Sequence, residues 1–387
     1  MYVHIPFCAV KCTYCDFPVA AGQDHRVERY LDALDREIGA YGPELDAPVD
    51  SIYLGGGTPS RLEPARIARV LAAVGARFQV DGDVEVTVEA NPEDLDDARL
   101  AGWVEAGVDR LSIGIQSLDD DVLRRAGRVH DGREALAAVA RARRHRFRSV
   151  SADLIGGLPG ERMDRWTATV ERVLEVEPDH VSFYLLEVDQ SSALAKAVRA
   201  GRERVASDDD QAAAFESTRA VLEGAGFEAY ELSNFARPGH RSRHNGKYWS
   251  DAWYAGFGLG AHGYARGARR SNLRGLTAYL RAVEDGRDPL AETDPWNAVR
   301  RLEEAMFLGL RRAEGVDPRE LGARYRVDVG AAYREVWERH RRDGLVTVAR
   351  DRIVLTARGR IRSNAVFRDI IGHLDEDAPD DFRRGAT

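Results

Sequence analysis

The alternation of short β-rich runs with longer amphipathic runs over the first 235 residues restricts the fold of this chain most strongly. Strand-like runs occupy residues 2–5, 51–54, 84–89, 110–115, 149–155 and 180–186. Amphipathic patterns typical of helices lie between them, for example at 26–39, 64–74, 131–144 and 166–175. Spacings of about 25 to 50 residues leave room for one crossover helix between strands, which predicts repeated βα units and a parallel sheet.

Six βα units fit an incomplete (β/α)6 barrel better than an open dinucleotide-binding sheet, because no GxGxxG motif follows the first strand. A barrel of this kind presents its functional residues at the carboxyl ends of the strands. Cys8 follows the first strand and the sequence GGGTP, residues 55–59, ends the second. Glu89, Gln116 and Asp153 lie at or near the ends of the next three strands. Motif positions and topology therefore predict the same functional edge.

The rest of the chain has a different character. After the predicted barrel of residues 1–235, residues 236–294 lose the alternation and are expected to form a connector rich in Gly, Arg, His and aromatic residues. Residues 295–370 are predicted to form a smaller winged-helix-like domain, with helices at 297–312, 318–325, 331–342 and 356–370 and a hairpin at 345–348 and 353–355. The acidic tail, 371–387, is expected to be disordered.

The composition fits a soluble globular protein with a net charge of −8, an apolar content of 44% and a charged content of 31%. Winged-helix modules often bind DNA, but acidic residues outnumber basic ones here and no recognition helix is marked, so nucleic-acid binding is not expected. No run approaches the roughly 18 apolar residues of a membrane span, which leaves only peripheral membrane contact. The N-terminus has no signal-peptide pattern, so a cytoplasmic location is expected.

All three cysteines, Cys8, Cys12 and Cys15, lie in the first fifteen residues, and this placement excludes a disulfide framework. One alternative is a zinc site, but structural zinc usually takes four ligands, and only His4 is nearby as a fourth. Another alternative is a redox pair of Cys12 and Cys15. The spacing CxxxCxxC favours a [4Fe–4S] cluster in which one iron has no protein ligand and is open to a substrate.

The cysteines stand in a longer string that resembles a known family. CxxxCxxC with an aromatic residue, Tyr14, before the last cysteine resembles the radical S-adenosylmethionine (SAM) superfamily. The string from Tyr2 to Phe17, YVHIPFC-x3-C-x-YCDF, resembles the branch of oxygen-independent coproporphyrinogen III oxidase and its HemW-type heme chaperone relatives. The resemblance extends to about residue 370. It implies a radical-SAM barrel, a [4Fe–4S] cluster whose unique iron chelates SAM, and reductive cleavage of SAM to a 5′-deoxyadenosyl radical.

Side chains at the strand ends match the positions that hold SAM in this family. The glycines would expose backbone groups to a ligand. Buried acids such as Glu89 need a partner, and the guanidinium group of Arg128 suits the geometry of a carboxylate. Taken singly, each would more often be a solvated charge or an ordinary turn. The resemblance implies Cys8, Cys12 and Cys15 as cluster ligands and a SAM site of Tyr2, Tyr14, Gly56, Gly57, Thr58, Glu89, Gln116, Arg128 and Asp153.

Two features separate the oxidase from the chaperone. Oxidases of this family carry a fourth cysteine two residues after the third, where this chain has Phe17, which cannot ligate a metal. The string HNxxYW, residues 244–249, resembles the chaperone branch, and His244 is the candidate heme ligand, with His240 and His262 as rivals. A hydrogen-bonded loop histidine remains the alternative for His244.

These features favour a heme chaperone over an oxidase that decarboxylates coproporphyrinogen III in porphyrin biosynthesis. The expected cofactors are a [4Fe–4S] cluster, SAM and heme. The expected partners are heme and heme-requiring apoproteins such as respiratory-chain enzymes, and a homodimer is compatible with the sequence.

Overall fold

The computed structural model describes residues 1–42, 47–265, 268–295 and 297–374. Its largest element is a nine-stranded sheet in the order β11-β1-β4-β5-β6-β7-β8-β10-β9. The six strands from β1 to β8 in this order run parallel to their neighbours. They are β1 (Tyr2–Ile5), β4 (Val49–Gly56), β5 (Val80–Ala90), β6 (Arg110–Gln116), β7 (Ser149–Gly156) and β8 (His180–Leu185). The predicted strands are thus confirmed, with small shifts at their ends.

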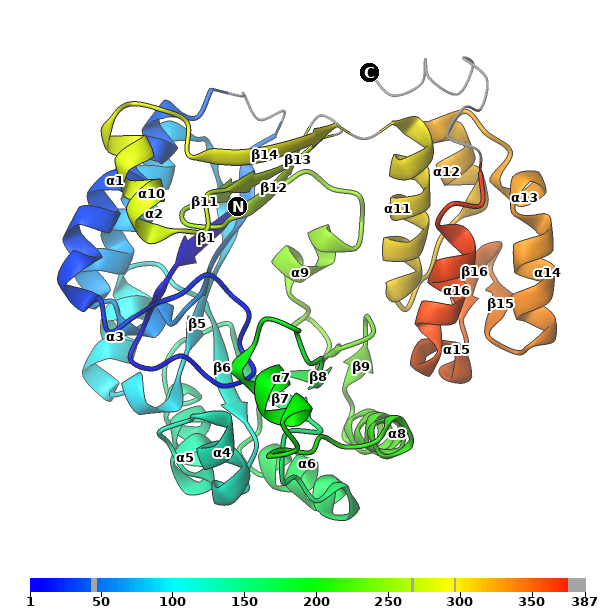
Figure 1. The fold of residues 1–387 in the computed structure, drawn as a ribbon, viewed down its shortest axis with the longest axis horizontal. Helices are drawn as coiled ribbons and strands as arrows, with labels where there is room; N and C mark the ends of the chain where they lie inside the picture. The colour runs from blue at the N-terminus through cyan, green and yellow to red at the C-terminus, as the bar shows by residue number, and fades with distance from the viewer. Residues whose placement is uncertain (43–46, 266–267, 296, 375–387) are drawn as a thin grey trace.

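Helices cover the outside of this curved sheet (Figure 1). Each buries one apolar stripe; in α1, for example, the buried residues include Tyr30, Leu34 and Ile38, which recur at the helical period. The helices of this layer are α1 (Val27–Ala40), α2 (Pro64–Arg77), α3 (Asp97–Glu105), α4 (Asp120–Ala126), α5 (Gly132–Ala142), α6 (Trp166–Leu174) and α8 (Asp208–Gly224). The amphipathic patterns predicted four of them. Helix α7 (Ala193–Arg199) lies instead beside the segment that carries the three cysteines.

The sheet is an open arc, as the incomplete-barrel prediction requires. Strand β11 (Gly256–Phe257) adds to β1 in parallel at one end. At the other end β10 (Asn234–Ala236) and β9 (Glu228–Ala229) add antiparallel strands beyond β8. The two ends of the strand order therefore stay apart, and the carboxyl ends of the six parallel strands share one edge.

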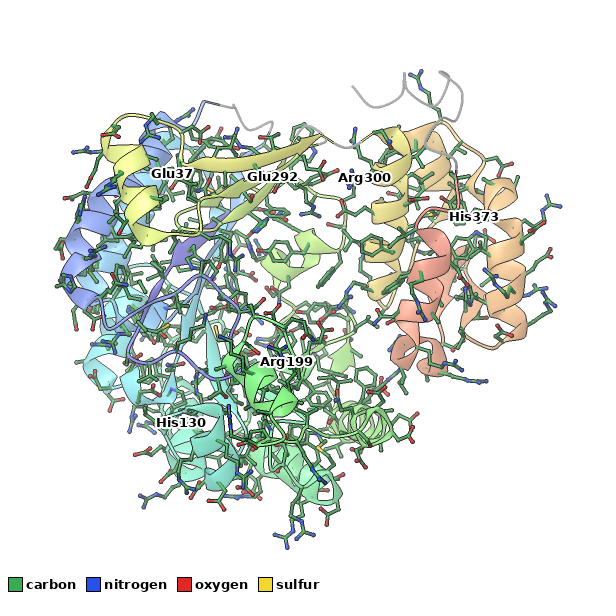
Figure 2. All side chains as sticks on the ribbon, in the orientation of Figure 1. Glu37, His130, Arg199, Glu292, Arg300 and His373 are labelled. Carbon is green, nitrogen blue, oxygen red and sulfur yellow. The ribbon has the colours of Figure 1, made fainter. Side chains whose placement is uncertain are left out.

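The segment after the barrel contributes α9 (Arg243–Tyr248), α10 (Leu276–Glu284) and a small antiparallel sheet of β12 (His262–Ala265), β13 (Ala268–Asn272) and β14 (Leu290–Pro295). One of its attachment points on the barrel is Glu37 of α1, labelled in Figure 2. The Glu37 carboxylate accepts hydrogen bonds from the Gly258 N–H (2.8 Å), the Asn272 amide (2.6 Å) and the Tyr279 hydroxyl (2.6 Å). Burial raises the pKa of Glu37 to about 7.

The C-terminal residues fold around a second apolar core that includes Leu302, Met306, Tyr333 and Val366. The elements are α11 (Ala298–Arg311), α12 (Pro318–Tyr325), α13 (Val329–Ala332), α14 (Arg334–Arg342), β15 (Val346–Ala349), β16 (Arg352–Leu355), α15 (Ala357–Ile361) and α16 (Ser363–Ile370). Figure 1 places this C-terminal domain beside the barrel, with α9 between the sheet and α11. The hairpin prediction is confirmed.

Two of the helix predictions in this domain are wrong in detail. The expected helix at 331–342 is interrupted at Tyr333, whose φ of −108° and ψ of 18° are not helical. The expected helix at 356–370 is interrupted in the same way at Arg362, with φ −105° and ψ 24°. Both residues continue an amphipathic pattern, so the sequence gives no sign of either break. Residues 375–387 of the expected tail lie outside the described residues, whereas Gly372 donates its N–H to Glu303 at 3.0 Å.

No helix in the described ranges is both long and apolar enough to cross a bilayer.

Candidate functional site

The cysteine loop is fixed at its two ends and at several points between them. Strand β2 (Phe7–Cys8) pairs in parallel with β3 (Ala20–Ala21), which closes the loop. Inside it, the Thr13 N–H donates to the Ala126 carbonyl at 3.1 Å, and the Thr13 carbonyl accepts from the Leu194 N–H at 2.8 Å. His4 Nε2 lies 2.9 Å from the Pro18 carbonyl oxygen. Three elements of the barrel therefore hold the loop against the carboxyl edge of the sheet.

The three thiols are free, and side-chain donors lie beside two of them. Cys8 is buried, and its Sγ accepts a hydrogen bond from the Thr58 hydroxyl at 3.4 Å. Cys12 Sγ lies 3.7 Å from Nη1 of Arg128, which donates to it. Burial raises the pKa of Cys8 and raises that of Cys15 to about 11, so charge on these sulfurs requires a cationic partner.

Within the described residues, no three His, Cys, Asp or Glu side chains converge closely enough to hold one metal ion. Cysteine thiolates are the usual ligands of a [4Fe–4S] cluster, and the three cysteines of this loop are the donor set that such a cluster would take.

The glycine turn at the end of β4 is shaped by close packing on the first strand. Gly56 has φ +112°, and a Cβ there would lie 2.2 Å from the His4 ring. A Cβ on Gly57 would lie 2.5 Å from the Pro6 carbonyl carbon. These glycines let the turn approach the strand that leads into the cysteine loop, because a side chain at either position would collide with that strand.

Glu89, at the end of β5, is already held in place. Its Oε1 accepts from the Tyr53 hydroxyl at 2.7 Å and its Oε2 accepts from the Gly56 N–H at 2.9 Å. Burial and the nearby Asp153 carboxylate raise the pKa of Glu89, whereas the two hydrogen-bond donors lower it. Among the described residues, no cation pairs with Glu89. An ammonium group near Glu89 would supply that cation.

Gln116 ends β6 in a strained conformation. Its φ of +64° lies in the left-handed region, and the register with β7 shifts between Gly114 and Gln116. Non-glycine residues in this region and irregular strand ends cluster at functional sites. The bulge turns the end of the strand toward Arg128, whose Nη2 donates to the Asn91 side chain at 2.7 Å and to the Gly114 carbonyl at 2.8 Å.

Arg128 retains one unused donor, because its Nε is buried without a hydrogen-bond partner among the described residues. Such orphans are rare and costly in native proteins, and a carboxylate ligand would satisfy this one.

Asp153, near the end of β7, accepts from two neighbouring hydroxyls. Ser112 donates to Oδ2 at 2.6 Å and Ser151 donates to Oδ1 at 2.8 Å. Burial raises the pKa of Asp153, and these two donors oppose the rise. Since β4, β5, β6 and β7 are successive neighbours, the structure brings Gly56, Glu89, Gln116 and Asp153 to one edge.

The two tyrosines take different places. The Tyr2 hydroxyl lies 2.9 Å from His4 Nδ1, and its ring stacks on Tyr53 with 6.2 Å between centroids. Tyr14 packs against the small apolar cluster that includes Val122 and Leu158, inside the cysteine loop.

His244 is buried in the first turn of α9, and both of its ring nitrogens have partners. Nδ1 lies 3.2 Å from the Ser51 hydroxyl and Nε2 lies 2.9 Å from the Tyr248 hydroxyl. The ring stacks on Tyr53 with 4.9 Å between centroids, so His244 reaches Glu89 through a single residue. Burial lowers the pKa of His244, which keeps the imidazole neutral.

The rival histidines are more accessible. Nδ1 of His240 is 3.9 Å from Asp179, and the ring borders a polar cavity of only about 60 Å³. His262 on β12 is exposed, and its ring makes no hydrogen bond within the described residues.

Tyr53 and Asn91 were missed as site residues by sequence reasoning. Tyr53 supports Glu89 and stacks on both Tyr2 and His244, and Asn91 holds Arg128. Each lies within two residues of a motif that the sequence marked, and that adjacency was the available signal.

Comparison with known families gives two matches that follow the two parts of the fold. A family model described as the radical SAM superfamily matches residues 2–173. A model described as the HemN C-terminal domain matches residues 299–362, inside the C-terminal domain.

Curated relatives match over nearly the whole chain. The heme chaperone HemW of Bacillus subtilis is 33% identical over 96% of this chain and 99% of its own length. The heme chaperone HemW of Mycobacterium tuberculosis is 38% identical over 96% of this chain and 94% of its own length. Among solved structures, coproporphyrinogen III oxidase (HemN) from Escherichia coli, a radical SAM enzyme, superposes with a TM-score of 0.84 at 24% identity, over 96% of this chain and 90% of that one. At this level of identity, the structural similarity to HemN supports the fold of the chain alone.

Proposed function

The chain belongs to the HemW heme chaperone family of the radical SAM superfamily, and from this premise we propose that it binds heme and delivers it to heme-dependent apoproteins. The observation that carries the proposal is near-full-length similarity to curated heme chaperones combined with Phe17 in place of a fourth cysteine. The Phe17 side chain is 56% exposed at the end of the cysteine loop, where it offers neither a metal ligand nor a thiol.

The family implies a [4Fe–4S] cluster and SAM, and the residues at the carboxyl edge fit both. Cys8, Cys12 and Cys15 would hold the cluster as thiolates. Bound there, the cluster and SAM would supply one-electron chemistry.

The role of the chain is to bind and orient SAM. Gly56, Gly57, Thr58 and Glu89 would receive its ammonium end, because no cation pairs with the Glu89 carboxylate within the described residues. The SAM carboxylate would meet Arg128, whose Nε has no acceptor in that same part of the chain. The remaining contacts would come from Gln116, Asp153, Tyr2 and Tyr14, with Asp153 at the ribose.

His244 stays our candidate heme ligand, and its hydrogen bonds add a condition. Nε2 must leave the Tyr248 hydroxyl, or Nδ1 the Ser51 hydroxyl, before either nitrogen can bind iron. His240 and His262 remain the alternatives. The recipients would be apoproteins such as respiratory-chain enzymes, reached in the cytoplasm or by peripheral contact with a membrane, with the carrier acting alone or as a homodimer.

The competing function is coproporphyrinogen III oxidation in porphyrin biosynthesis. It shares the fold, but Phe17 weighs against it.

The direct test is an anaerobic heme titration of the cluster-loaded protein, repeated with His244→Ala and with His240→Ala and His262→Ala as matched comparisons. We expect saturable binding of about one heme per chain, weakened selectively by His244→Ala. An unchanged titration in that variant would move the ligand to another residue, and no saturable binding by the unsubstituted protein would overturn the chaperone function.

A further inference from the structure

A small polar cavity lies at the amino ends of β6 and β7, on the opposite side of the sheet's length from the carboxyl edge. Arg110 and Ser149, the first residues of these two strands, line it together with residues of the loop that leads into α9. Its volume is about 60 Å³. A water molecule needs roughly 10–15 Å³ of such a cavity, so the space suits about four or five heavy atoms. A heme or a nucleotide is far too large for it.

Arg110 places a buried positive charge at this cavity. The residue is only 4% exposed, and its Nη1 donates to the His240 carbonyl at 2.8 Å. No carboxylate forms an ion pair with Arg110 within the described residues. A guanidinium group stays protonated, and a buried charge without a counter-charge is costly. The carbonyl satisfies one N–H donor but leaves the charge of Arg110 uncompensated.

Ser149 gives a second, independent observation. It pairs with Arg110 in the parallel register of β6 and β7, so the two side chains lie on the same face of the sheet. The Ser149 hydroxyl is fully buried and has no hydrogen-bond partner in the described part of the chain. Buried hydroxyls without a partner are uncommon in native proteins, because the lost hydration is not replaced. A charged donor and a neutral donor therefore meet at one cavity.

Three more arginines line the cavity, and each is neutralised by acids that do not line it. They are Arg148, Arg241 and Arg243, and their ion-pair partners are Asp83, Asp109, Glu228 and Glu314. These ion pairs hold the rim of the cavity in place. They leave the charge of Arg110 as it is.

Glu85 is the acid that lines the cavity, and its carboxylate is used by the start of α9. Its Oε1 accepts from the Ser242 hydroxyl at 3.2 Å and from the His244 N–H at 3.1 Å. Its Oε2 accepts from the Arg243 N–H at 3.0 Å. One acid against four arginines leaves the lining with a positive balance, which favours an anion.

We propose that this cavity binds one small tetrahedral oxyanion, of the phosphate or sulfate class, between Arg110 and Ser149. Arg110 donates charge-assisted hydrogen bonds to it, and the Ser149 hydroxyl donates another. Such an anion has five heavy atoms, which matches the volume. Water would satisfy the donors but would not compensate the charge. The site is separate from heme binding and does not depend on the proposed function.

The test titrates the cluster-loaded, full-length protein with potassium phosphate, potassium sulfate and potassium acetate, each against potassium chloride at equal ionic strength. Binding is measured by isothermal titration calorimetry and by the rise in Tm. Ser149→Ala removes a hydroxyl that has no partner, so the fold loses little. Arg110→Gln removes the charge and keeps an N–H donor for the His240 carbonyl.

The matched control is Thr87→Val. Thr87 pairs with Arg110 from the other neighbouring strand, is fully buried, and its hydroxyl also lacks a partner among the described residues. It does not line the cavity. The control therefore removes a comparable hydroxyl outside the site.

We expect phosphate and sulfate to raise the Tm saturably and chloride to leave it unchanged, because a ligand of the folded state stabilises that state. Ser149→Ala should weaken phosphate binding about tenfold, and Arg110→Gln about 100-fold or more. Thr87→Val should bind phosphate as the unsubstituted protein does. Acetate should bind more weakly than phosphate, since it fills less of the cavity and carries less charge.

Three results would overturn the proposal. Without any saturable response to phosphate or sulfate, the cavity holds water alone. Equal phosphate affinity in Ser149→Ala and Thr87→Val would place the anion elsewhere, and this pair decides the matter even if Arg110→Gln does not fold. Tighter binding of acetate than of phosphate would assign the cavity to a carboxylate instead of a tetrahedral anion.

Discussion

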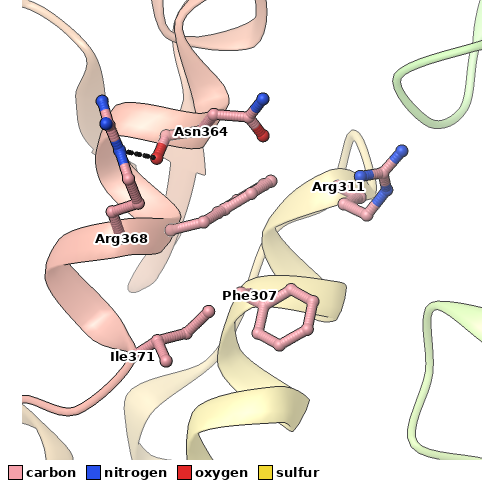
Figure 3. Close-up of a pocket in the computed structure, with 6 residues that line it drawn as sticks. Phe307, Arg311, Asn364, Arg368 and Ile371 are labelled. Carbon is pink, nitrogen blue, oxygen red and sulfur yellow. Dashed lines mark hydrogen bonds between the residues drawn. The ribbon is translucent and has the colours of Figure 1, made fainter. Parts of the chain in front are cut away.

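The carboxyl edge of the barrel and a groove between α11 and α16 of the C-terminal domain (Figure 3) are built in opposite ways; the groove is lined by Phe307, Arg311, Asn364, Phe367, Arg368 and Ile371. At the edge, polar side chains are held by other protein groups: Glu89 by Tyr53 and Gly56, and Asp153 by Ser112 and Ser151. In the groove, Phe307 is half-buried and Phe367 is buried, and the guanidinium groups of Arg311 and Arg368 form no ion pair within the described residues. The first arrangement suits a ligand that must be oriented, whereas the second places cationic groups beside a mostly apolar surface.

The two regions are joined by the HNxxYW string. At one end His244 stacks on Tyr53, which supports Glu89, and at the other end Trp249 stacks on Arg311. The HNxxYW string therefore contacts both regions of the molecule, and neither region contains all of its residues.

The variant with the largest expected effect should remove the cluster from the carboxyl edge and leave the C-terminal domain unchanged. Cys12→Ala should abolish the cluster, measured as iron and acid-labile sulfide after anaerobic purification, because the remaining two thiolates cannot hold it. Phe17→Ala, in the same loop, should keep full iron content. Stoichiometric zinc without iron or sulfide in the unsubstituted protein would contradict the cluster assignment.

A second variant tests the orientation of the ligand at the edge. Glu89→Gln keeps the shape but removes the charge that we expect to face the SAM ammonium group, so SAM affinity should fall about 10- to 100-fold by equilibrium dialysis. Glu105→Gln, which changes an exposed residue at the end of α3, is the matched control. Equal SAM affinity in Glu89→Gln and the unsubstituted protein would remove Glu89 from the site.

A third variant tests how Glu37, which lies outside both regions, contributes to the pH dependence of folding stability. The pKa of Glu37 is raised from the ordinary 4.5 to about 7, so the folded chain binds more protons than the unfolded chain in that window. Stability from this group is therefore present below pH 4.5 and is lost as the pH rises to about 7. Relative to Glu37→Gln, the unsubstituted protein should lose a few °C of Tm over this range. Parallel Tm curves would show that Glu37 titrates normally.

The smallest expected effect concerns the link between the two regions. Tyr248→Phe removes the hydroxyl at Nε2 of His244 and should cost about 1 kcal/mol of unfolding free energy or less. If His244 binds iron, freeing Nε2 should strengthen the ligation signature in the heme absorption spectrum. A weaker signature would mean that Tyr248 supports the ligand instead of competing with it.

The gathering of the candidate residues at one edge could be predicted from the sequence, because each of them lies at a strand end. Cys8, Glu89, Gln116 and Asp153 each follow an apolar run, and the parallel topology then brings them together. The support of Glu89 by Tyr53 could not be predicted, since it depends on how two neighbouring strands align in register. The left-handed conformation of Gln116 was likewise invisible, because a glutamine gives no sign of positive φ.

The groove could not be predicted for a different reason. Phe307 and Phe367 are sixty residues apart on two helices whose patterns read as ordinary amphipathic faces. Which apolar residues remain at the surface is decided by the packing of α11 on α16, and the interruption at Arg362 sets the course of α16. Propensity and periodicity do not specify that packing.

The measurement that tests the account most directly is an anaerobic incubation of the cluster-loaded protein with SAM, a reductant and coproporphyrinogen III, run beside a heme titration of the same sample. The account predicts saturable heme binding with no protoporphyrinogen formed. Many turnovers of coproporphyrinogen III to protoporphyrinogen IX would contradict it and identify an oxidase that works without a cysteine at position 17.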